Sequence, residues 1–505
     1  MKKKFTLFLF CGLLCTANLN AQTWQIGYPN AADVTATLQD STLTISGIGA
    51  MMDWDNWAVN PPWRRLDEDI HRSVSTIIIE NGVTTIGMRA FSWMFPVTSV
   101  TIPNSVTSIG GWAFSGCGRL TSVNISNNIT SIGESAFANT GLASVTIPST
   151  VTTIGFGAFA DCRNLTSIEV DVNNPNYSSR DGVLFNRHQT ILMQYPAGKQ
   201  GEYVIPNSVW TISHNAFVGA IGLTSVTIPN SVTFIGNNAF LGCGVLTSVT
   251  IPNSVTTIGS NAFGRGASEV GTVLSNLIIE DGTSILNLSA GEWVIDTLYL
   301  GRNINWTVNV FGTSIEHLTI GNNVTTIGSM AFANNRQLTS VIIGSNVEAI
   351  GPNAFMNCTA LRSVISLNPV PPTTIVGNPF PADARNFGTL YVISDEALAL
   401  YQEANIWRDF LNIRVLQPSN IDVVNVETIQ IFPNPVTHEL HIINHDWQVN
   451  DVVELFDMNG RLVFSQSVGA KNLSPLQEFT IDMSPFNAGN YILRIGNRVA
   501  KVVKM

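Results

Sequence analysis

The sequence predicts a mainly β fold: a right-handed solenoid of 23-residue turns with one parallel sheet, followed by a small C-terminal β-sandwich. Three observations predict it. The motif L-x-S-V-x-I-P-x-S-V-x-x-I-G-x-x-A-F recurs every 23 residues, with one 22-residue copy at residues 120–141, and a fixed interval of this size indicates stacked repeats. The chain is 45% hydrophobic but only 12% charged, which is typical of β-rich extracellular proteins when Ser, Thr and Asn supply the polarity. In the last part of the chain the motif gives way to short, evenly spaced strands.

Each copy of the motif begins with a strand. In one copy, Val100 and Ile102 alternate with Ser99 and Thr101, which is the period of a strand with one buried face. Pro103 then begins a turn. One copy buries roughly six apolar side chains, worth on the order of 10–15 kcal/mol. Ordering its backbone costs more, at roughly 1–2 kcal/mol per residue, so the copies fold only when they stack.

The motif, with a Cys or Asn at the third place after its Phe, resembles the BspA-type leucine-rich repeat over about residues 45–415. In that family the Phe and the Cys or Asn are core positions. The resemblance therefore implies a leucine-rich-repeat solenoid, and it implies adhesion, including contact with host matrix proteins or other cells in some members. The Phe column comprises Phe91, Phe114, Phe137, Phe159, Phe217, Phe240, Phe263, Phe332 and Phe355.

Residues 1–21 are predicted to be a signal peptide. Lys2–Lys4 supply the basic region, Phe5–Cys15 the apolar region, and Leu19–Ala21 a cleavage site. The apolar run is too short to span a bilayer, and we expect no transmembrane helix in the mature chain. A lipoprotein modified at Cys15 is the alternative, which the large side chain of Leu14 disfavours.

Residues 22–73 are predicted to form an N-terminal cap, with a starter strand at Leu43–Ser46. A dense apolar group follows it, made of Met51, Met52, Trp54, Trp57 and Trp63. We favour a cap because a solenoid must cover the exposed end of its core. The functional alternative is a Trp-rich sugar platform with Asp53 and Asp55 beside it.

Residues 74–366 hold the repeats. One turn is lengthened by residues 173–201, whose turn signals predict a hairpin-like excursion. Residues 266–316 are degenerate, because the Ala-Phe pair is absent there, and we expect the core to lack its aromatic ring.

Residues 367–417 are predicted to form a C-terminal cap. It contains a last strand at Leu390–Ile393 and a helix at Ser394–Phe410, with Ser394 as its N-cap. Leu398, Tyr401 and Phe410 would close the far end of the core.

A linker at residues 418–427 leads to a domain at residues 428–505. The P-N-P, D-x-x-G-R and G-x-Y-x-L/I elements of this domain resemble the C-terminal sorting domain of type IX secretion. The residues that carry the match are Pro433, Asn434, Pro435, Gly460, Gly489 and Tyr491. The resemblance implies the type IX secretion machinery as a partner, export to the extracellular or outer-membrane surface, and a source among the Bacteroidota.

The sequence contains no recognisable catalytic or metal-binding pattern. His438, His441 and His445 cluster beside Glu439, but the spacing is not H-E-x-x-H, and His438 and His441 would face opposite sides of a strand. The sequence contains no phosphate loop and no C-x-x-C. We therefore expect a protein that is not an enzyme and uses no catalytic residue, cofactor or metal. A basic run is also missing, so nucleic acid is not an expected partner.

The four cysteines beyond the leader occupy the third place after the repeat Phe. They are Cys117, Cys162, Cys243 and Cys358. No two stand in adjoining turns, and two turns are separated by roughly 9–10 Å, whereas a disulfide needs Cα atoms within about 7 Å. We expect four free thiols. The adjoining turns carry Met94, Thr140, Ala220, Gly266 and Asn335 at that place.

The candidate binding face consists of the outward positions of the strands. It comprises Ser99, Thr101, Ser122, Asn124, Ser144, Thr146, Ser167, Glu169, Ser225, Thr227, Ser248, Thr250, Tyr299 and His317. Regularly spaced hydroxyls offer weak hydrogen bonds of about 0.5–1.5 kcal/mol each to a long repetitive partner. The alternative is that the face has no binding role, and that Ser and Thr occur there only because they favour strands and keep the surface soluble.

The sequence is consistent with two functions. The first is a secreted or cell-surface module that mediates adhesion, binding a host or neighbouring-cell surface protein or glycan. The second is a structural spacer or coat protein without a specific ligand. A spacer would keep its face uniform, whereas Glu169, Tyr299, His317 and Ile342 interrupt the hydroxyl columns, which favours binding.

Overall fold

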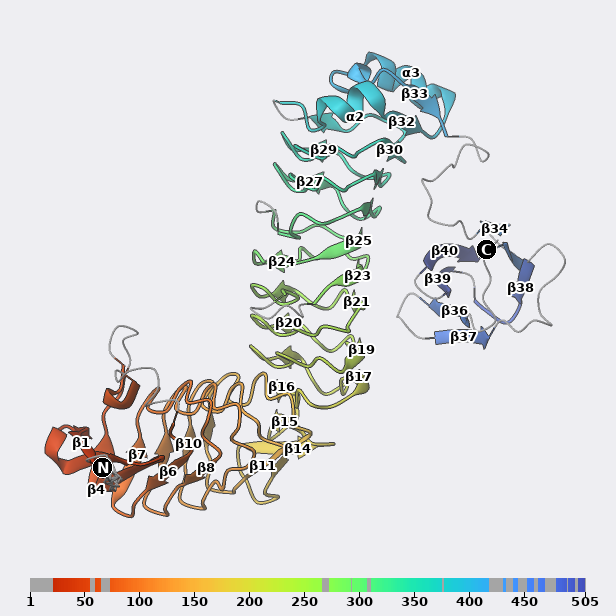
Figure 1. The fold of residues 1–505 in the computed structure, drawn as a ribbon. Helices are drawn as coiled ribbons and strands as arrows, with labels where there is room; N and C mark the ends of the chain where they lie inside the picture. Colours follow the sequence, from red (N-terminus) through yellow and green to blue (C-terminus); the bar gives the residue numbers. More distant parts are fainter. Residues whose placement is uncertain are drawn as a thin grey trace, which may run out of the picture. The chain divides into compact units, whose positions relative to one another are not determined.

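The computed structural model in Figure 1 divides into two compact units, residues 1–187 and 188–505. The structure describes residues 21–54, 60–64, 73–265, 272–291, 293–306, 310–374, 377–416, 430–432, 439–443, 452–457, 462–467, 478–487, 489–495 and 498–504. We call residues 21–187 the first coil and residues 188–416 the second coil. The predicted signal peptide lies outside the described residues, apart from Ala21.

The first coil begins with a β-rich cap. Its elements are β1 (Gln22–Gln25), β2 (Gly27–Tyr28), η1 (Ala31–Asp33), β3 (Val34–Gln39), β4 (Thr42–Gly47), β5 (Gly49–Met51) and η2 (Pro62–Arg64). Strands β1, β3 and β4 are antiparallel, and β4 then pairs in parallel with β6 (Thr76–Ile79). The starter strand predicted within β4 is therefore confirmed.

Each regular turn of the first coil contributes two short strands to two parallel sheets. The strands are β7 (Val83–Ile86), β8 (Ser99–Thr101), β9 (Ser108–Ile109), β10 (Ser131–Ile132), β11 (Ser144–Ile147), β12 (Thr153–Ile154) and β13 (Ser167–Val170). On one side of the coil, β6 and β8 pair in one sheet and β11 and β13 in another, whereas the second side holds a single sheet that runs β12-β10-β9-β7-β5-β2. This second sheet, built from the V-x-x-I part of the motif, was not predicted.

The lengthened turn forms a hairpin, as its turn signals indicate. Strand β14 (Tyr177–Arg180) pairs antiparallel with β15 (Val183–Asn186). The hairpin is packed into the coil rather than only projecting from it, because Phe185 is fully buried. At its base, buried Asn174 donates to the carbonyl oxygens of Pro148 and Val151 at 2.8 and 3.0 Å.

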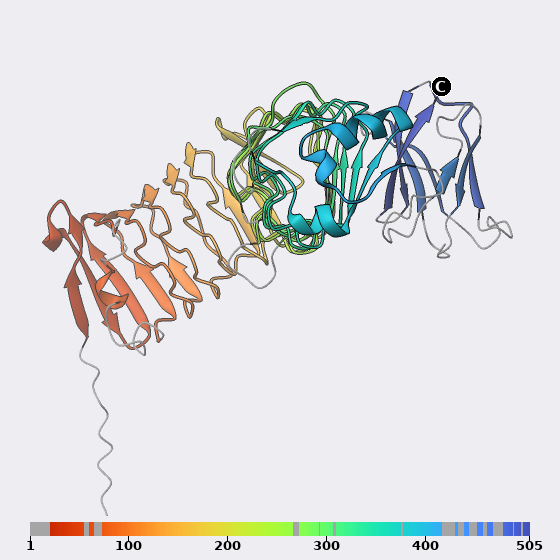
Figure 2. The same cartoon turned by 90° about the horizontal axis from the view of Figure 1, so that it is seen from above.

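The second coil repeats the two-sheet turn. Its strands are β16 (Ile191–Gln194), β17 (Gly201–Val204), β18 (Thr211–Ile212), β19 (Leu223–Thr227), β20 (Phe234–Ile235), β21 (Ser248–Ile251), β22 (Thr257–Ile258), β23 (Leu274–Ile279), β24 (Asn287–Leu288), β25 (Ile295–Leu300), β26 (His317–Ile320), β27 (Thr326–Ile327), β28 (Ser340–Ile343), β29 (Ala349–Ile350), β30 (Ser363–Ser366), β31 (Thr373–Thr374), β32 (Thr389–Val392) and β33 (Ile413–Val415). An eight-stranded sheet runs β21-β23-β25-β26-β28-β30-β32-β33. Figure 2, which views this coil nearly along its axis, shows the turns as closed loops around one core.

Stacked aromatic rings form the core of both coils. In the first coil Trp63 stacks on Phe91, and the column continues to Phe159 at centroid distances of 5.3–5.8 Å. In the second coil the column crosses the degenerate turns through Trp293 and Phe311, which contact Phe263 and Phe332 respectively. The expectation that residues 266–316 lack a core aromatic is therefore wrong.

The second coil ends in a small helical cap. It contains α2 (Ala382–Phe387), α3 (Asp395–Glu403) and η3 (Trp407–Asp409). Ser394 is the N-cap of α3 as predicted, accepting from the Ala397 N–H at 3.2 Å. Tyr401, Phe410 and the unpredicted Trp407 are buried, whereas Leu398 is only half-buried.

Two predictions about this cap are wrong. The strand at residues 389–392 is not the last one, because β33 pairs beyond it. The helix ends at Glu403 instead of reaching Phe410, because the chain leaves helical geometry and Ile406 has a φ of 74°.

The C-terminal domain contains two antiparallel sheets. The first consists of β34 (Gln430–Phe432), β35 (Glu439–Ile443) and β38 (Glu478–Asp482), and the second of β36 (Val452–Asp457), β37 (Leu462–Ser467), β39 (Gly489–Ile495) and β40 (Arg498–Lys504). Both sheets supply buried residues to one core, for example Leu440 and Leu493. Within the described parts of the chain, every helix is too short or too polar to cross a bilayer.

Candidate functional site

The motif fixes which side chains leave the coil. The residue two places before each core Phe of the repeat has positive φ, a left-handed conformation that suits Gly and Asn. The residue two places after it also has positive φ in every turn except that of Phe263. The first set is Arg89, Trp112, Ser135, Gly157, Asn215, Asn238, Asn261, Met330 and Asn353; the second is Trp93, Gly116, Asn139, Asp161, Gly219, Gly242, Asn334 and Asn357. The Ala and Phe between them turn inward and are buried.

The predicted binding face is solvent-accessible along its whole length. None of its residues is buried, and Ser99, Thr101, Thr227 and Thr250 are exposed. Within the first coil, the strand register aligns Thr146 with Glu169. The predicted direction of these side chains is confirmed, and their role in binding stays a prediction.

Two kinds of hydroxyl lie on this face, and the structure separates them. Thr98 and Thr166, at the strand starts, donate to the carbonyl oxygens of Ser75 and Ala143 one turn earlier, each at 3.3 Å. By contrast, the side chains of Ser99, Thr101 and the corresponding residues of β11, β19 and β21 make no hydrogen bond within the described chain. The hydroxyls of β8, β11, β19 and β21 are thus open to a ligand, whereas Thr98 and Thr166 join neighbouring turns. Ser167 is an exception on the face, because its hydroxyl donates to the Glu169 carboxylate.

The 22-residue turn interrupts the face of the first coil. Residues 121–126 form no strand, so β8 and β11 belong to different sheets. A shallow depression of about 280 Å³ lies there, lined by Asn104, Asn124, Ile125, Ser126, Asn127 and Asn128. The Oγ atom of buried Ser126 has no partner among the described residues. Asn124 is the one predicted face residue that this depression contains.

In the second coil one outward column becomes apolar. The strand register places Ile278 beside Tyr299, then Thr319 and Ile342. Ile365 and Tyr391 continue it, and all six are partly exposed. Of these six residues, Tyr299, Thr319 and Ile342 were predicted to lie in the outward columns. The rest were missed because a V-x-I core pattern and a partly exposed isoleucine look alike in a short apolar run.

Two polar side chains on the strand face of the second coil already have hydrogen-bond partners within the chain. The hydroxyl of Tyr299 donates to both carboxylate oxygens of Asp281, at 3.0 and 3.1 Å. Burial, and then the negative charge of Asp281, raise the pKa of Tyr299 above its ordinary value. His317 Nδ1 lies 3.1 Å from the Ser340 hydroxyl in the next strand. These contacts fix both rings on the sheet surface.

A buried ionic group replaces the motif in the degenerate turns. Arg302 is fully buried and donates to the carbonyl oxygens of Asn253 and Pro252 at 2.6 and 3.0 Å. Glu280 accepts from the Asn253 N–H at 3.0 Å, and burial raises its pKa. Glu280 contacts the backbone of the preceding turn and Arg302 that of the turn before it, which identifies both groups as structural.

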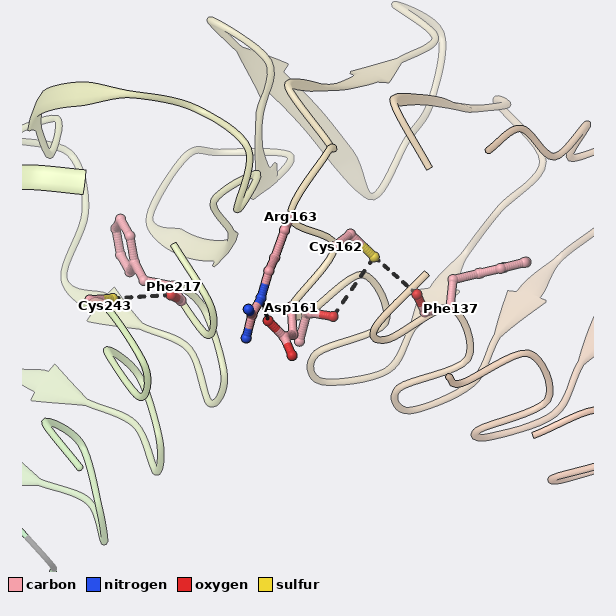
Figure 3. Close-up of polar contacts among 7 residues, drawn as sticks. Phe137, Asp161, Cys162, Arg163, Phe217 and Cys243 are labelled. Carbon is pink, nitrogen blue, oxygen red and sulfur yellow. Dashed lines mark hydrogen bonds and ion pairs between the residues drawn. The ribbon is translucent and has the colours of Figure 1, made fainter. Parts of the chain in front are cut away.

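The cysteines are buried, free and spaced along the core. Figure 3 shows Cys162 Sγ donating to the Phe137 carbonyl oxygen at 3.0 Å, and Cys243 Sγ to that of Phe217 at 3.2 Å. The prediction of four unpaired thiols is confirmed. Gly266 lies outside the described residues, and Thr272 instead donates to the Phe240 carbonyl in the turn after Cys243.

The Trp-rich sugar platform proposed for the N-terminal cap is not formed. Trp54 and Trp63 are buried, and the Trp63 indole N–H donates to the Ala90 carbonyl oxygen at 2.9 Å. Asp53 accepts from the Met88 N–H at 2.6 Å. These residues close the core, as the cap interpretation predicts. Trp57 and Asp55 lie outside the described residues.

The C-terminal domain shows only part of the predicted sorting motif. Gly489 and Tyr491 lie in β39, and the Tyr491 hydroxyl donates to the Asn487 carbonyl oxygen at 2.7 Å. The P-N-P segment and Gly460 lie outside the described residues, as do His438 and His445. His441 lies in β35. Among the described residues, no group of three His, Cys, Asp or Glu side chains is arranged to hold a metal ion.

Comparison with protein families gives two matches. A model of the BspA type leucine-rich repeat region matches six copies at residues 70–180, 197–283 and 307–375, together more than half of the chain. A model of the secretion system C-terminal sorting domain matches residues 430–505. A search of curated proteins found no match.

Solved structures of bacterial repeat proteins are also similar. A leucine-rich repeat protein from Eubacterium ventriosum is 26% identical, with a TM-score of 0.45 over 78% of this chain and 93% of the other. One from Bacteroides ovatus is 20% identical, with a TM-score of 0.46 over 78% and 99%. A leucine-rich cell surface protein from Faecalibacterium prausnitzii is 23% identical, with a TM-score of 0.39 over 66% and 93%.

Proposed function

Since the chain belongs to the family of BspA-type leucine-rich repeat proteins, we propose that its coils are a non-catalytic binding module that mediates adhesion through the strand face. The C-terminal sorting domain directs the protein through type IX secretion to the cell surface or the extracellular space. The binding partner we propose is a protein or glycan of a host or neighbouring cell surface.

The observation that carries the proposal is the division of labour between hydroxyls. Thr98 and Thr166 bond to the preceding turn, whereas Ser99 and Thr101 extend into solvent without a partner in the described chain. A row of open hydroxyls offers repeated weak hydrogen bonds of about 0.5–1.5 kcal/mol each, which add up along an extended partner.

A spacer without a ligand is the second candidate, and one observation favours it. The hydroxyl columns of β8, β11, β19 and β21 are nearly uniform. Against it stands the apolar column from Ile278 to Tyr391, because partly exposed isoleucines on a sheet add nothing to a hydrated coat. We therefore favour binding over spacing.

The test combines a screen with a face variant. The mature chain is screened against matrix proteins and a glycan array, and the ligand found is titrated by surface plasmon resonance. Changing Thr101, Thr146, Thr227 and Thr250 together to Lys should abolish binding while leaving the melting temperature unchanged, because all four are exposed. The matched control carries four lysines at exposed positions outside the face, namely Asn164, Asn207, Asn230 and Gln337. Equal binding by both variants would exclude the strand face as the site.

A further inference from the structure

Three bulky residues of the first coil, Arg89, Trp93 and Trp112, occupy left-handed positions of the repeat. Trp93 stands two places after the core Phe with a φ of 60°, where the equivalent residues are Gly116, Asn139, Asp161, Gly219, Gly242, Asn334 and Asn357. A bulky side chain in this left-handed region costs roughly 1–2 kcal/mol. Burial does not offset that cost, because Trp93 is 54% exposed. Strain of this kind at an exposed aromatic residue points to function rather than folding.

The Trp93 ring lies flat against the next turn. A Cβ atom at Gly116 would lie 2.7 Å from Cε3 and 2.9 Å from Cδ2 of the indole. Phe95 repeats the arrangement: a Cβ at Gly118 would lie 2.7 Å from one atom of its ring and 2.9 Å from another. Phe95 is 57% exposed. Each ring therefore packs against a glycine and stays more than half exposed, and the Arg119 guanidinium lies over the Phe95 ring.

The two rings are held rigidly. Met94, between them, is fully buried at the cysteine position of the core, and the Trp93 N–H donates to the Ser115 carbonyl oxygen at 2.6 Å. Pro96 follows Phe95 and restricts the backbone. A preorganised surface loses little entropy when a ligand binds.

A hydrogen-bonding group lies beside the rings. The Arg119 guanidinium carbon lies 5.4 Å from the centroid of the Phe95 ring. A guanidinium carries five N–H donors, so hydroxyl or carboxylate oxygens at the edge of a stacked ligand would find donors there. The segment leads into β8 but contains none of the open hydroxyls of the strand face.

We propose that Trp93, Phe95 and Arg119 form a carbohydrate-binding site that stacks the pyranose rings of an oligosaccharide. The C–H groups on one face of a pyranose are weakly positive and match the negative face of an aromatic ring. The hydroxyls at its rim match the donors of Arg119. This site is separate from the strand face. Its test is therefore independent of the test of the adhesion proposed above.

The test is calorimetric titration of the full mature chain with cellohexaose and with chitohexaose. We expect binding of at least one, and a loss of affinity of tenfold or more in both Trp93→Gly and Phe95→Ala. Trp93→Gly should also melt at the same or a higher temperature, because glycine relieves the left-handed strain. That combination separates a binding residue from a structural one, whose removal lowers the melting temperature.

Two control variants test whether the loss of sugar binding is specific to Trp93 and Phe95. Trp210→Ala removes a tryptophan that is 56% exposed in the second coil and should leave hexasaccharide binding unchanged, as should the four-lysine variant of the strand face. The proposal is overturned if neither hexasaccharide binds at millimolar concentration, or if Trp93→Gly binds as well as the parent chain. Binding of a proline-rich peptide in place of both sugars would also overturn it and assign the rings to protein recognition.

Discussion

The Sγ atom of Cys117 lies 3.2 Å from the carbonyl oxygen of Phe91, one turn earlier in the coil. The same contact joins Cys358 to Phe332 at 3.3 Å, so each thiol satisfies a buried backbone acceptor. Burial raises the pKa of Cys117 to about 12 and that of Cys162 to about 11. The thiols are therefore structural hydrogen-bond donors that stay protonated at neutral pH.

We expect these thiols to be inert until the chain unfolds. Thiolate is the reactive form, and all four cysteines of the two coils are buried. Titration of the mature chain with a thiol reagent should detect no thiol in the folded protein and four after denaturation without reductant. Two or fewer in the denatured sample would indicate disulfides and contradict the register.

Stability should fall at alkaline pH. In the unfolded chain these thiols ionise near 9.0, whereas the folded values for Cys117 and Cys162 are about 12 and 11. Between these limits the unfolded state binds fewer protons, so the free energy of unfolding decreases as pH rises from 9 through 11. Urea unfolding midpoints at pH 8, 9, 10 and 11 measure this effect. Replacing the four cysteines by alanine should flatten the profile, and an unchanged slope would assign it to tyrosines such as Tyr195 and Tyr401.

One stabilising substitution follows from the left-handed positions. Met330 has a φ of 53° where Asn261 and Asn353 have 52° and 58°. Since asparagine tolerates this conformation better than methionine, Met330→Asn should raise stability by about 1 kcal/mol. The reverse change, Asn353→Met, should lower it by a similar amount. Urea unfolding measures both changes in the free energy of unfolding. If both substitutions changed it in the same direction, the preference for asparagine at these left-handed positions would be refuted.

Removing a core aromatic side chain should lower stability by a similar amount in regular and degenerate turns. Phe137→Ala should cost about 3–5 kcal/mol through the cavity it leaves. Because Trp293 occupies the same column in the second coil, Trp293→Ala should cost a similar amount, and the described parts of residues 272–316 should resist hydrogen exchange like the regular turns. Val172→Ala, at a side chain that is 79% exposed, is the control. A small loss of stability in Trp293→Ala would instead indicate that the degenerate turns are weakly packed.

The sorting domain should be needed for export but not for folding of the coils. It has its own core, made of residues such as Leu440 and Leu493. Deleting residues 429–505 should leave the melting temperature of the coils unchanged and leave the protein in the periplasm. Cell fractionation with antibody labelling of intact cells measures the outcome, and normal surface display would argue against the assignment.

The sequence predicts those features that depend on local periodicity. The alternation around Val100 and Ile102 defines the first strand of each turn, and the interval between Phe and Cys defines the core and the free thiols. The turn signals of residues 173–201 predict the hairpin. Each of these signals lies within one copy of the motif.

Features that depend on contacts between turns could not be predicted. The core position of Trp293 could not be predicted, because the irregular length of the degenerate turns prevents its alignment with Phe263 in the sequence. The flat exposure of the Trp93 ring depends on Gly116 in the following turn. Likewise, Thr98 just before β8 and Thr101 within it are the same residue type, and only the neighbouring carbonyl groups distinguish the structural hydroxyl from the open one.

Within each coil, the aromatic column gives every turn the same two joining surfaces. Phe114 meets Phe91 on one side and Phe137 on the other, at 5.3 Å in both directions. A whole 23-residue cassette can therefore be duplicated or lost in the gene while the rings on either side meet again at the same spacing. Coil length is then a trait that recombination between near-identical copies can change in one step, while the fold of each turn stays the same.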